Sequence, residues 1–276
     1  MDNGQKPAVP AFGRKVFFLY PPTFSVGARI VETLKRLEYE VYTISDYRRA
    51  KAYMRIHHDA LLFVNPDIQM SIPAWINFFR SIKEDVSFSS TVIGICYEYL
   101  TPVDLKSLQD CGFIEAGIFR VEKQLVGMVT SMAVKMNSLG TKGQRQHVRA
   151  SCASDRNAGF LWISQGRMFK AKLIDISTAS AAILVSEDNL PFLNTKTKFV
   201  VSLQLSAKQM QIHVKSLVVK PKSPGVYAAI FLITEDTPEE SITMIREYIF
   251  GTLEILMEQS IEGFSIDKTN YAIAPR

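Results

Sequence analysis

Hydrophobic positions follow a repeating pattern along the first half of the chain. Short apolar runs end in Pro, Asn or other polar residues, and stretches with apolar residues at helical spacing follow them. Near-continuous apolar strands that alternate with helices are typical of a parallel sheet covered on both faces. The pattern predicts five strand–helix pairs between residues 14 and 138, with strands at 15–20, 40–44, 59–64, 91–96 and 115–119.

The pattern changes after residue 140. A polar, Gly-containing segment leads into short runs rich in Val, Ile, Phe and Leu, separated by turn residues such as Gln165-Gly166. Regular short strands with turn signals favour a small antiparallel barrel. The expected six strands lie at 159–164, 167–177, 181–186, 198–205, 210–221 and 225–233.

A long amphipathic helix is expected after these strands, at residues 238–259. Its apolar face consists of Ile242, Ile245, Ile249, Leu253 and Leu256. We expect this face to pack on the barrel or on a second subunit, so the chain could form a homodimer. The fold class is therefore α/β plus mainly β. The expected divisions are a flexible tail at 1–13, an α/β domain at 14–138, a linker at 139–149, a barrel with its helix at 150–262 and a tail at 263–276.

Charge is distributed unevenly along the chain. The net charge is +5, but residues 135–172 hold eight Lys or Arg against one acid, whereas residues 235–267 hold nine acids against one base. A basic middle and an acidic end indicate a local anion site rather than a general nucleic-acid surface.

Several classes of protein are disfavoured by what the sequence lacks. The start has no apolar signal segment, no uncharged apolar run reaches about 18 residues, and the three cysteines have no CxxC spacing. We therefore expect a cytoplasmic protein with reduced thiols and no membrane span. No GxSxG motif, Walker loop, Cys–His pair or metal-ligand cluster occurs, so we predict neither an enzyme nor a metal or cofactor site.

The first half resembles the receiver domain of response regulators in the order and length of its elements. The resemblance implies acids after the first strand and an Asp after the third, which together bind Mg²⁺ and accept phosphate. Here Tyr20 follows the first strand and Asn65 follows the third, with Asp67 the only acid nearby. Tyr97 stands where Ser or Thr is usual, and Arg120 or Lys123 is nearest to the usual Lys. We expect a pseudo-receiver that is not phosphorylated.

Two arginines and an Asp-x-Ser motif carry the chemistry of the second half. Arg145 and Arg149 precede the first barrel strand, and Asp175 and Ser177 end the second. Guanidinium groups match phosphate oxygens or the O6/N7 edge of guanine, and a carboxylate can accept from the N1 and N2 donors of guanine. Taken alone, the arginines are more typical of a solvated basic linker than of a ligand site, and Asp175 and Ser177 are also typical of a turn that caps a strand end.

With the six strands and the following helix, these residues resemble the PilZ domain, a barrel that binds cyclic di-GMP. The family pattern is RxxxR followed by D/N-x-S-x-x-G, and Ser180 stands here where Gly is usual. If that position needs a positive φ, Ser costs about 1 kcal/mol; if it needs only a small side chain, Ser costs little. The resemblance implies ligand contacts from Arg145, Arg149, Asp175, Ser177 and Ser180.

We therefore predict a non-catalytic cyclic di-GMP receptor that couples binding to domain rearrangement and to contact with a protein partner. The resemblance implies a partner in motility or envelope functions. The alternative is a PilZ-like adaptor that has lost its ligand and acts through protein contacts alone. Ser180 and the altered receiver-like site favour the adaptor, whereas the two arginines, Asp175 and Ser177 favour the receptor. A nucleic-acid partner is not expected, because no basic stripe interleaved with aromatic residues runs through the barrel.

Overall fold

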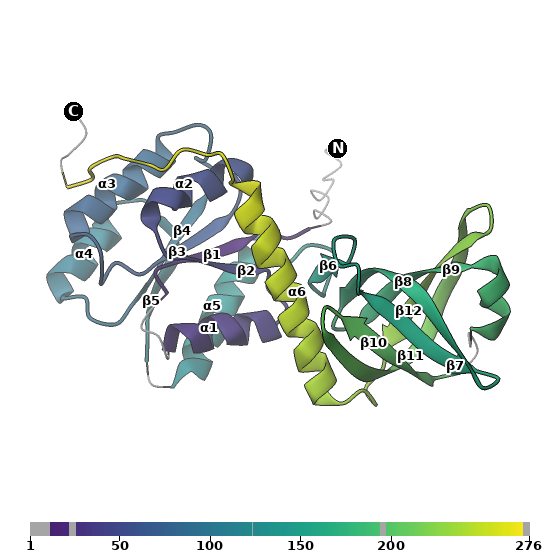
Figure 1. The fold of residues 1–276 in the computed structure, drawn as a ribbon. Coiled ribbons are helices and arrows are strands. Elements are labelled where there is room, and N and C mark those ends of the chain that lie inside the picture. Colours follow the sequence, from purple (N-terminus) through teal and green to yellow (C-terminus); the bar gives the residue numbers. More distant parts are fainter. Residues whose placement is uncertain (1–11, 22–25, 123, 194–196, 273–276) are drawn as a thin grey trace, which may run out of the picture. The chain divides into compact units, whose positions relative to one another are not determined.

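A computed structural model describes residues 12–21, 26–122, 124–193 and 197–272 of the chain (Figure 1). The chain divides into two compact units: Met1–Gln146 together with Glu258–Arg276, and His147–Met257. The tail expected at 1–13 lies almost wholly outside the described residues. Among the described helices, none is both long enough and apolar enough to cross a bilayer.

The first unit is built on a five-stranded parallel sheet in the order β2-β1-β3-β4-β5. This is the flavodoxin-like order of doubly wound sheets, which response-regulator receivers share. Strands β1 and β3 are buried along their whole length, as their unbroken apolar runs predict. The strands are β1 (Val16–Leu19), β2 (Val41–Ile44), β3 (Leu61–Val64), β4 (Val92–Tyr97) and β5 (Ile114–Arg120).

Helices cover both faces of this sheet (Figure 1): α1 and α5 lie on one face, and α2, α3 and α4 on the other. Local capping signals start two of them. The Asp46 side chain accepts the Arg48 backbone N–H at the start of α2, and Thr101 accepts that of Asp104 at the start of α4. The helices are α1 (Val26–Arg36), α2 (Tyr47–Ile56), α3 (Ile72–Lys83), α4 (Pro102–Asp110) and α5 (Leu125–Ser138).

The second unit is an antiparallel barrel in the order β8-β7-β10-β11-β12-β9, closed by pairing of β8 with β9. These are the six strands that the sequence predicts. A further short strand, β6 (Arg149–Ser151), pairs with β8 where the sequence indicates a linker. The barrel strands are β7 (Gly159–Ser164), β8 (Arg167–Ser177), β9 (Ser180–Ser186), β10 (Phe199–Leu205), β11 (Lys208–Ser223) and β12 (Val226–Ile233).

Helix α6 (Glu239–Ser260) packs most of its predicted apolar face on the barrel, whereas Leu256 of that face is 42% exposed. Ile245 and Ile249 are fully buried in the barrel core, and Ser241 donates from its hydroxyl to the Gln211 carbonyl at 2.9 Å. Of the two packing alternatives open from the sequence, contact with the barrel is therefore the one that the structure shows. A short 3₁₀ helix, η1 (Glu187–Phe192), follows β9, and its Phe192 carbonyl accepts the Trp162 indole N–H.

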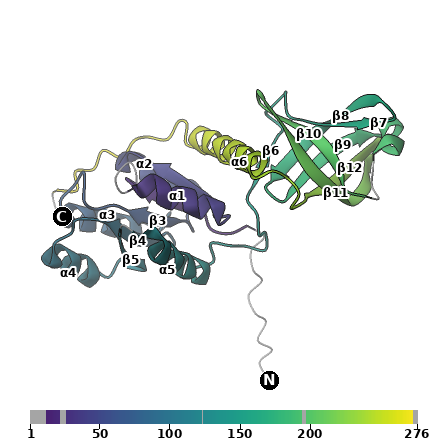
Figure 2. The same cartoon turned by 90° about the horizontal axis from the view of Figure 1, so that it is seen from below.

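The segment after α6 belongs to the first unit, although the sequence indicates a tail there. In both views it runs along α2 and α3 (Figures 1 and 2). The Asp267 N–H donates to the Arg48 carbonyl at 2.9 Å, and the Asn77 amide donates to the Tyr271 carbonyl at 3.0 Å. Tyr271 is only 4% exposed. The segment has no helical or strand periodicity, so its docking depends on tertiary contacts that local pattern does not reveal.

Candidate functional site

Strand pairing brings Arg149 and Asp175 together on the outside of the barrel. Arg149 lies opposite Ser177 and Ser151 lies opposite Asp175, so Arg149 and Asp175 are diagonal neighbours on one face of β6 and β8. The alternating residues Ala150 and Ile176 are fully buried. The Arg149 Nη1 and Asp175 Oδ1 atoms are 3.4 Å apart, and the side chains are 34% and 33% exposed.

A loose, part-exposed ion pair of this kind contributes little to stability, about 0–1 kcal/mol. A ligand that offers better partners can therefore separate the two groups at small cost. The forked donor of Arg149 can bind a phosphodiester or the O6/N7 edge of a guanine, and the Asp175 carboxylate can accept from the N1 and N2 donors of a guanine. Among the predicted residues, the structure thus brings the guanidinium of Arg149 and the carboxylate of Asp175 together.

Ser177 and Ser180 serve the turn between β8 and β9. The Ser177 Oγ accepts the backbone N–H of Ser180 at 3.0 Å and that of Ala179 at 3.3 Å, and it shares a 3.0 Å hydrogen bond with the Ser180 Oγ. Both serines are buried. This is the strand-capping turn that the sequence leaves open as an alternative, and it fixes the end of β8 next to Asp175.

The backbone at Ser180 does not adopt a positive φ. Of the two possibilities raised by Ser in place of Gly, the second therefore applies: the position needs a small side chain and no left-handed backbone. The three preceding positions hold no Gly either, and the two-residue turn consists of Thr178 and Ala179. Ser180 is thus a fitting residue for this turn, with a hydroxyl that has a partner.

We expect Ser180→Gly to lower the free energy of unfolding of the barrel by about 1–2.5 kcal/mol. The substitution removes a buried hydrogen bond, worth about 0.5–1.5 kcal/mol, and adds Gly to a strand, which costs about 0.5–1 kcal/mol. Urea unfolding of the wild type, Ser180→Gly and Ser180→Ala measures this, because Ser180→Ala removes only the hydroxyl. A more stable Ser180→Gly variant would show that the position prefers glycine after all.

Arg145, the other predicted arginine, lies in the first unit, whereas Arg149 lies in the second. Its guanidinium stands 4.4 Å from the centre of the Phe12 ring, a cation–π contact worth about 0.5–1 kcal/mol at an exposed site. Phe12 itself is well exposed. No signal in the sequence predicts this contact, because Phe12 belongs to a segment without periodicity.

A residue beside the turn adds to the polar groups near the Arg149–Asp175 pair. The Thr178 hydroxyl is 3.4 Å from the His147 Nδ1, so the histidine within the RxxxR segment touches the β8–β9 turn. The RxxxR pattern singles out its two arginines and neither His147 nor Thr178. Only the pairing of β6 with β8 shows that the two lie together.

In the first unit, the carboxyl ends of the strands carry the residues that replace a receiver's acids. Asn65 directly follows β3, is buried, and accepts the Asp67 N–H on its Oδ1 at 3.0 Å. The Asp67 carboxylate accepts the backbone N–H of Glu98 at 2.6 Å and that of Tyr99 at 3.3 Å. Asp67 therefore fastens the loop after β4, and its oxygens are already engaged.

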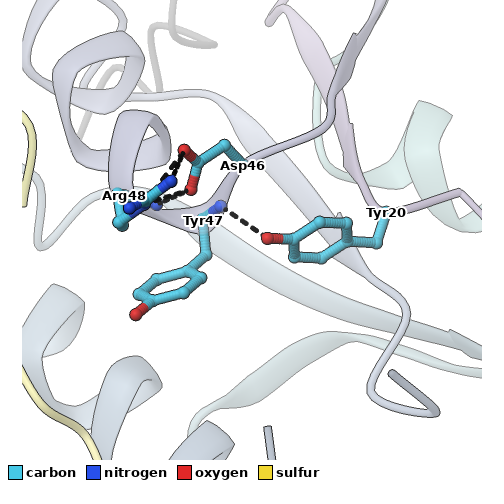
Figure 3. Close-up of polar contacts among 4 residues, drawn as sticks. All are labelled: Tyr20, Asp46, Tyr47 and Arg48. Carbon is cyan, nitrogen blue, oxygen red and sulfur yellow. Dashed lines mark hydrogen bonds and ion pairs between the residues drawn. The ribbon is translucent and has the colours of Figure 1, made fainter. Parts of the chain in front are cut away.

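Tyr20, which follows β1, takes the place of the missing acids and closes on the start of α2 (Figure 3). Its hydroxyl accepts the Tyr47 N–H at 3.1 Å, and burial raises the pKa of this phenol. Asp46 holds Arg48 by two bonds, of 2.9 Å to Nε and 2.8 Å to Nη2, and these bonds lower the pKa of the carboxyl. The N-terminus of α2 is thus satisfied by groups of the protein itself.

The structure also locates the other positions that the resemblance to a receiver singles out. Among the described residues, no cluster of His, Cys, Asp or Glu could hold a metal ion. Tyr97 ends β4 and Arg120 ends β5, as the resemblance to a receiver implies. Lys123 lies outside the described residues. The cysteines are free, and burial raises the pKa of both Cys96 and Cys152 to about 12, so neither is a reactive thiolate.

We expect the full chain to remain unphosphorylated by acetyl phosphate with Mg²⁺. An amide at Asn65 cannot form an acyl phosphate, and the carboxylate of Asp67 is bonded to two backbone N–H groups. Intact-mass measurement checks this, with Asn65→Asp as a control that restores an acceptor without the metal-binding acids and is also expected to stay unlabelled. A phosphate on Asp67 of the wild type would contradict the pseudo-receiver interpretation.

Comparison with known proteins gives distant structural likenesses only. No family model matches the chain, and no curated protein resembles it in sequence. The solved structures similar to it include the PilZ domain of YcgR from Escherichia coli with c-di-GMP, at 11% identity over 43% of this chain and 98% of that one, with a TM-score of 0.37.

Two further solved structures are similar to the chain. The K. pneumonia MrkH–c-di-GMP complex is 17% identical over 42% of this chain and 54% of that one, with a TM-score of 0.34. The chemotaxis response regulator CheY4 of Vibrio cholerae is 16% identical over 46% of this chain and 98% of that one, with a TM-score of 0.36. The chain thus spans about half the length of MrkH. We transfer no functional residue from likenesses this distant.

The fold of each unit is defined by its strand order. A doubly wound sheet in the order β2-β1-β3-β4-β5 is followed by a closed six-stranded antiparallel barrel with a C-terminal helix. The chain therefore combines a receiver-like α/β sandwich with a PilZ-like barrel.

Proposed function

We propose that this protein is a receptor for cyclic di-GMP, with the ligand bound on the outer face of β6 and β8. The observation that carries the proposal is the Arg149–Asp175 pair, which the fold places side by side and leaves one-third exposed. Asp175 would accept from the N1 and N2 donors of a guanine. Arg149 would then be free to bind the phosphate or the O6/N7 edge.

The other predicted residues have different roles in this proposal. Arg145 supplies a second guanidinium from the segment that leads into the barrel, four residues before Arg149. Ser177 and Ser180 are positioning residues, because their hydroxyls are buried in the turn that holds the end of β8. Thr178 in the same turn and His147 in the RxxxR segment, whose side chains lie 3.4 Å apart, are further polar groups beside the proposed site.

Ligand binding would also change the segment between the two units. Arg145 would exchange the ring of Phe12 for an anionic partner, which costs about 0.5–1 kcal/mol and gains a charge-assisted contact of about 1.5–3 kcal/mol. That contact would reposition residues 139–148, which lie between α5 and β6. We propose that this change alters how the units are held and so changes the surface offered to a protein partner.

The adaptor alternative keeps one specific observation in its favour. The Ser177 hydroxyl, which the family pattern implies as a ligand contact, already has its partners within the turn. In that case the Arg149–Asp175 pair would be a structural ion pair and the barrel would act through protein contacts alone. Calorimetric titration of the full chain with cyclic di-GMP, and with GTP as the reference nucleotide, separates the two functions.

A further inference from the structure

One side of the barrel is basic and contains no acid. The strands β8, β7, β10 and β11 are neighbours in this order. Residues 159–173 include β7 and the part of β8 that ends at Leu173, and residues 199–223 include β10 and β11. These two ranges contain seven Lys or Arg and no Asp or Glu. Strand alternation points Lys170 and Lys172 outward, because Ala171 and Leu173 between them are buried. Lys215 is likewise exposed beside the buried Val214.

Apolar side chains project from the middle of this basic side. Ile163 and Met168 lie directly opposite each other on β7 and β8, and they are 71% and 70% exposed. The register of β10 with β7 pairs Ser202 with Leu161, which places Val200, 46% exposed, opposite Ile163. We call these three residues the apolar tip.

The apolar tip is held rigidly at the end of a tight hairpin. Gln165 and Gly166 both have positive φ, at 50° and 73°, as a two-residue primed turn requires. Beneath the tip, the Trp162 ring stacks on Phe169, and the Trp162 indole N–H donates to the Phe192 carbonyl at 2.9 Å. The exposed apolar side chains are therefore presented by an ordered part of the barrel and are not a frayed end.

The charge on this side decides which partner suits it. Two copies of the same side would repel each other, because neither contributes an acid. Single-stranded nucleic acid is disfavoured, since no aromatic residue is exposed on the described part of the barrel for bases to stack on. An anionic bilayer surface needs no matching groove, attracts each Lys or Arg near it, and takes up apolar side chains among its headgroups.

We infer that the outer side of β8, β7, β10 and β11 docks onto an anionic lipid surface. The apolar tip enters the headgroup region, and Arg167, Lys170 and Lys215 contact lipid phosphates around it. This site differs from the Arg149–Asp175 pair, which lies beyond Leu173 toward the opposite end of β8. The inference does not depend on the proposed ligand.

Vesicle co-sedimentation of the full chain tests the inference. We expect binding to phosphatidylcholine vesicles that contain phosphatidylglycerol, weak binding to phosphatidylcholine alone, and release by salt. We expect the double variant Lys170→Glu/Lys215→Glu to lower the partition coefficient at least about ten-fold, since each basic residue near the surface contributes about 1 kcal/mol. The double variant Ile163→Ser/Met168→Ser should also lower it at least about ten-fold, because it removes apolar side chains from the headgroup region. The matched controls are Lys106→Glu and Val126→Ser, exposed positions in the first unit that should leave binding unchanged.

Several outcomes would overturn the inference. Absence of binding to anionic vesicles at low salt would do so, as would equal binding by the charge-reversed variant. Binding to a DNA duplex at the same salt without binding to vesicles would assign the basic side to a nucleic acid instead. Circular dichroism of each variant confirms that the barrel is intact, so that loss of binding is not loss of fold.

Discussion

Replacing Tyr271 with alanine is expected to lower the free energy of unfolding of the first unit by about 3–5 kcal/mol, the range for large buried aromatic residues. The Tyr271 ring is almost fully buried and makes edge contacts with Phe78 and Tyr47, with centroids 5.3 and 6.1 Å away. Its hydroxyl donates to Asp267 at 2.5 Å. The segment beyond α6 is therefore a structural part of the first unit, and losing its anchor removes several contacts together.

The matched control is Tyr99→Ala, because Tyr99 is 75% exposed and should change stability by no more than about 0.5 kcal/mol. The chain has two tryptophans, Trp75 in the first unit and Trp162 in the second. In a Trp162→Phe background, Trp75 fluorescence during urea unfolding reports on the first unit, since Trp75 packs against Phe78 with centroids 5.6 Å apart. Equal stabilities for the two alanine variants would show that the segment is not docked.

Replacing Arg149 with alanine is expected to weaken cyclic di-GMP binding at least ten-fold. A bidentate guanidinium contact to a guanine is worth about 1–3 kcal/mol, and a ten-fold change in affinity corresponds to about 1.4 kcal/mol. The fold should survive, because Arg149 is part-exposed and its 3.4 Å ion pair with Asp175 is loose. Arg145→Ala should weaken binding by a similar factor if both guanidinium groups hold the ligand.

Arg167→Ala provides the matched control for these arginines. Arg167 begins β8, at the opposite end of the strand from Asp175, so it should not affect the ligand. Comparing the dissociation constants of the three variants by calorimetry distinguishes a specific contact from a general loss of positive charge. If Arg149→Ala and Arg167→Ala bind equally well, the assignment of Arg149 to the ligand is wrong.

The architecture is largely predictable from the sequence because each element has a local signature. Burial on both sides leaves unbroken apolar runs in β1 and β3, and turn residues such as Gln165-Gly166 mark where barrel strands reverse. All six barrel strands lie where the sequence places them. The docked segment around Tyr271 is not predictable in this way, because distant contacts hold it and no periodicity of its own does.

The site is only partly predictable for a related reason. A motif shows which residue types occur at which spacing. It singles out Arg149 and Asp175 without showing that their strands pair. A motif does not show that the Ser177 hydroxyl accepts a hydrogen bond within the turn, or that the Asp67 carboxylate accepts one from the loop after β4. Those assignments depend on which donors lie within hydrogen-bonding distance, and only the folded chain determines that.

The most direct test of the receptor proposal is a calorimetric titration of cyclic di-GMP into the full-length wild type and into the double variant Arg149→Ala/Asp175→Ala, with GTP titrated into both. We predict saturable binding of cyclic di-GMP by the wild type, strongly weakened binding by the double variant, and no comparable binding of GTP. Absence of cyclic di-GMP binding by the wild type at high micromolar ligand would contradict the proposal and leave the barrel as an adaptor.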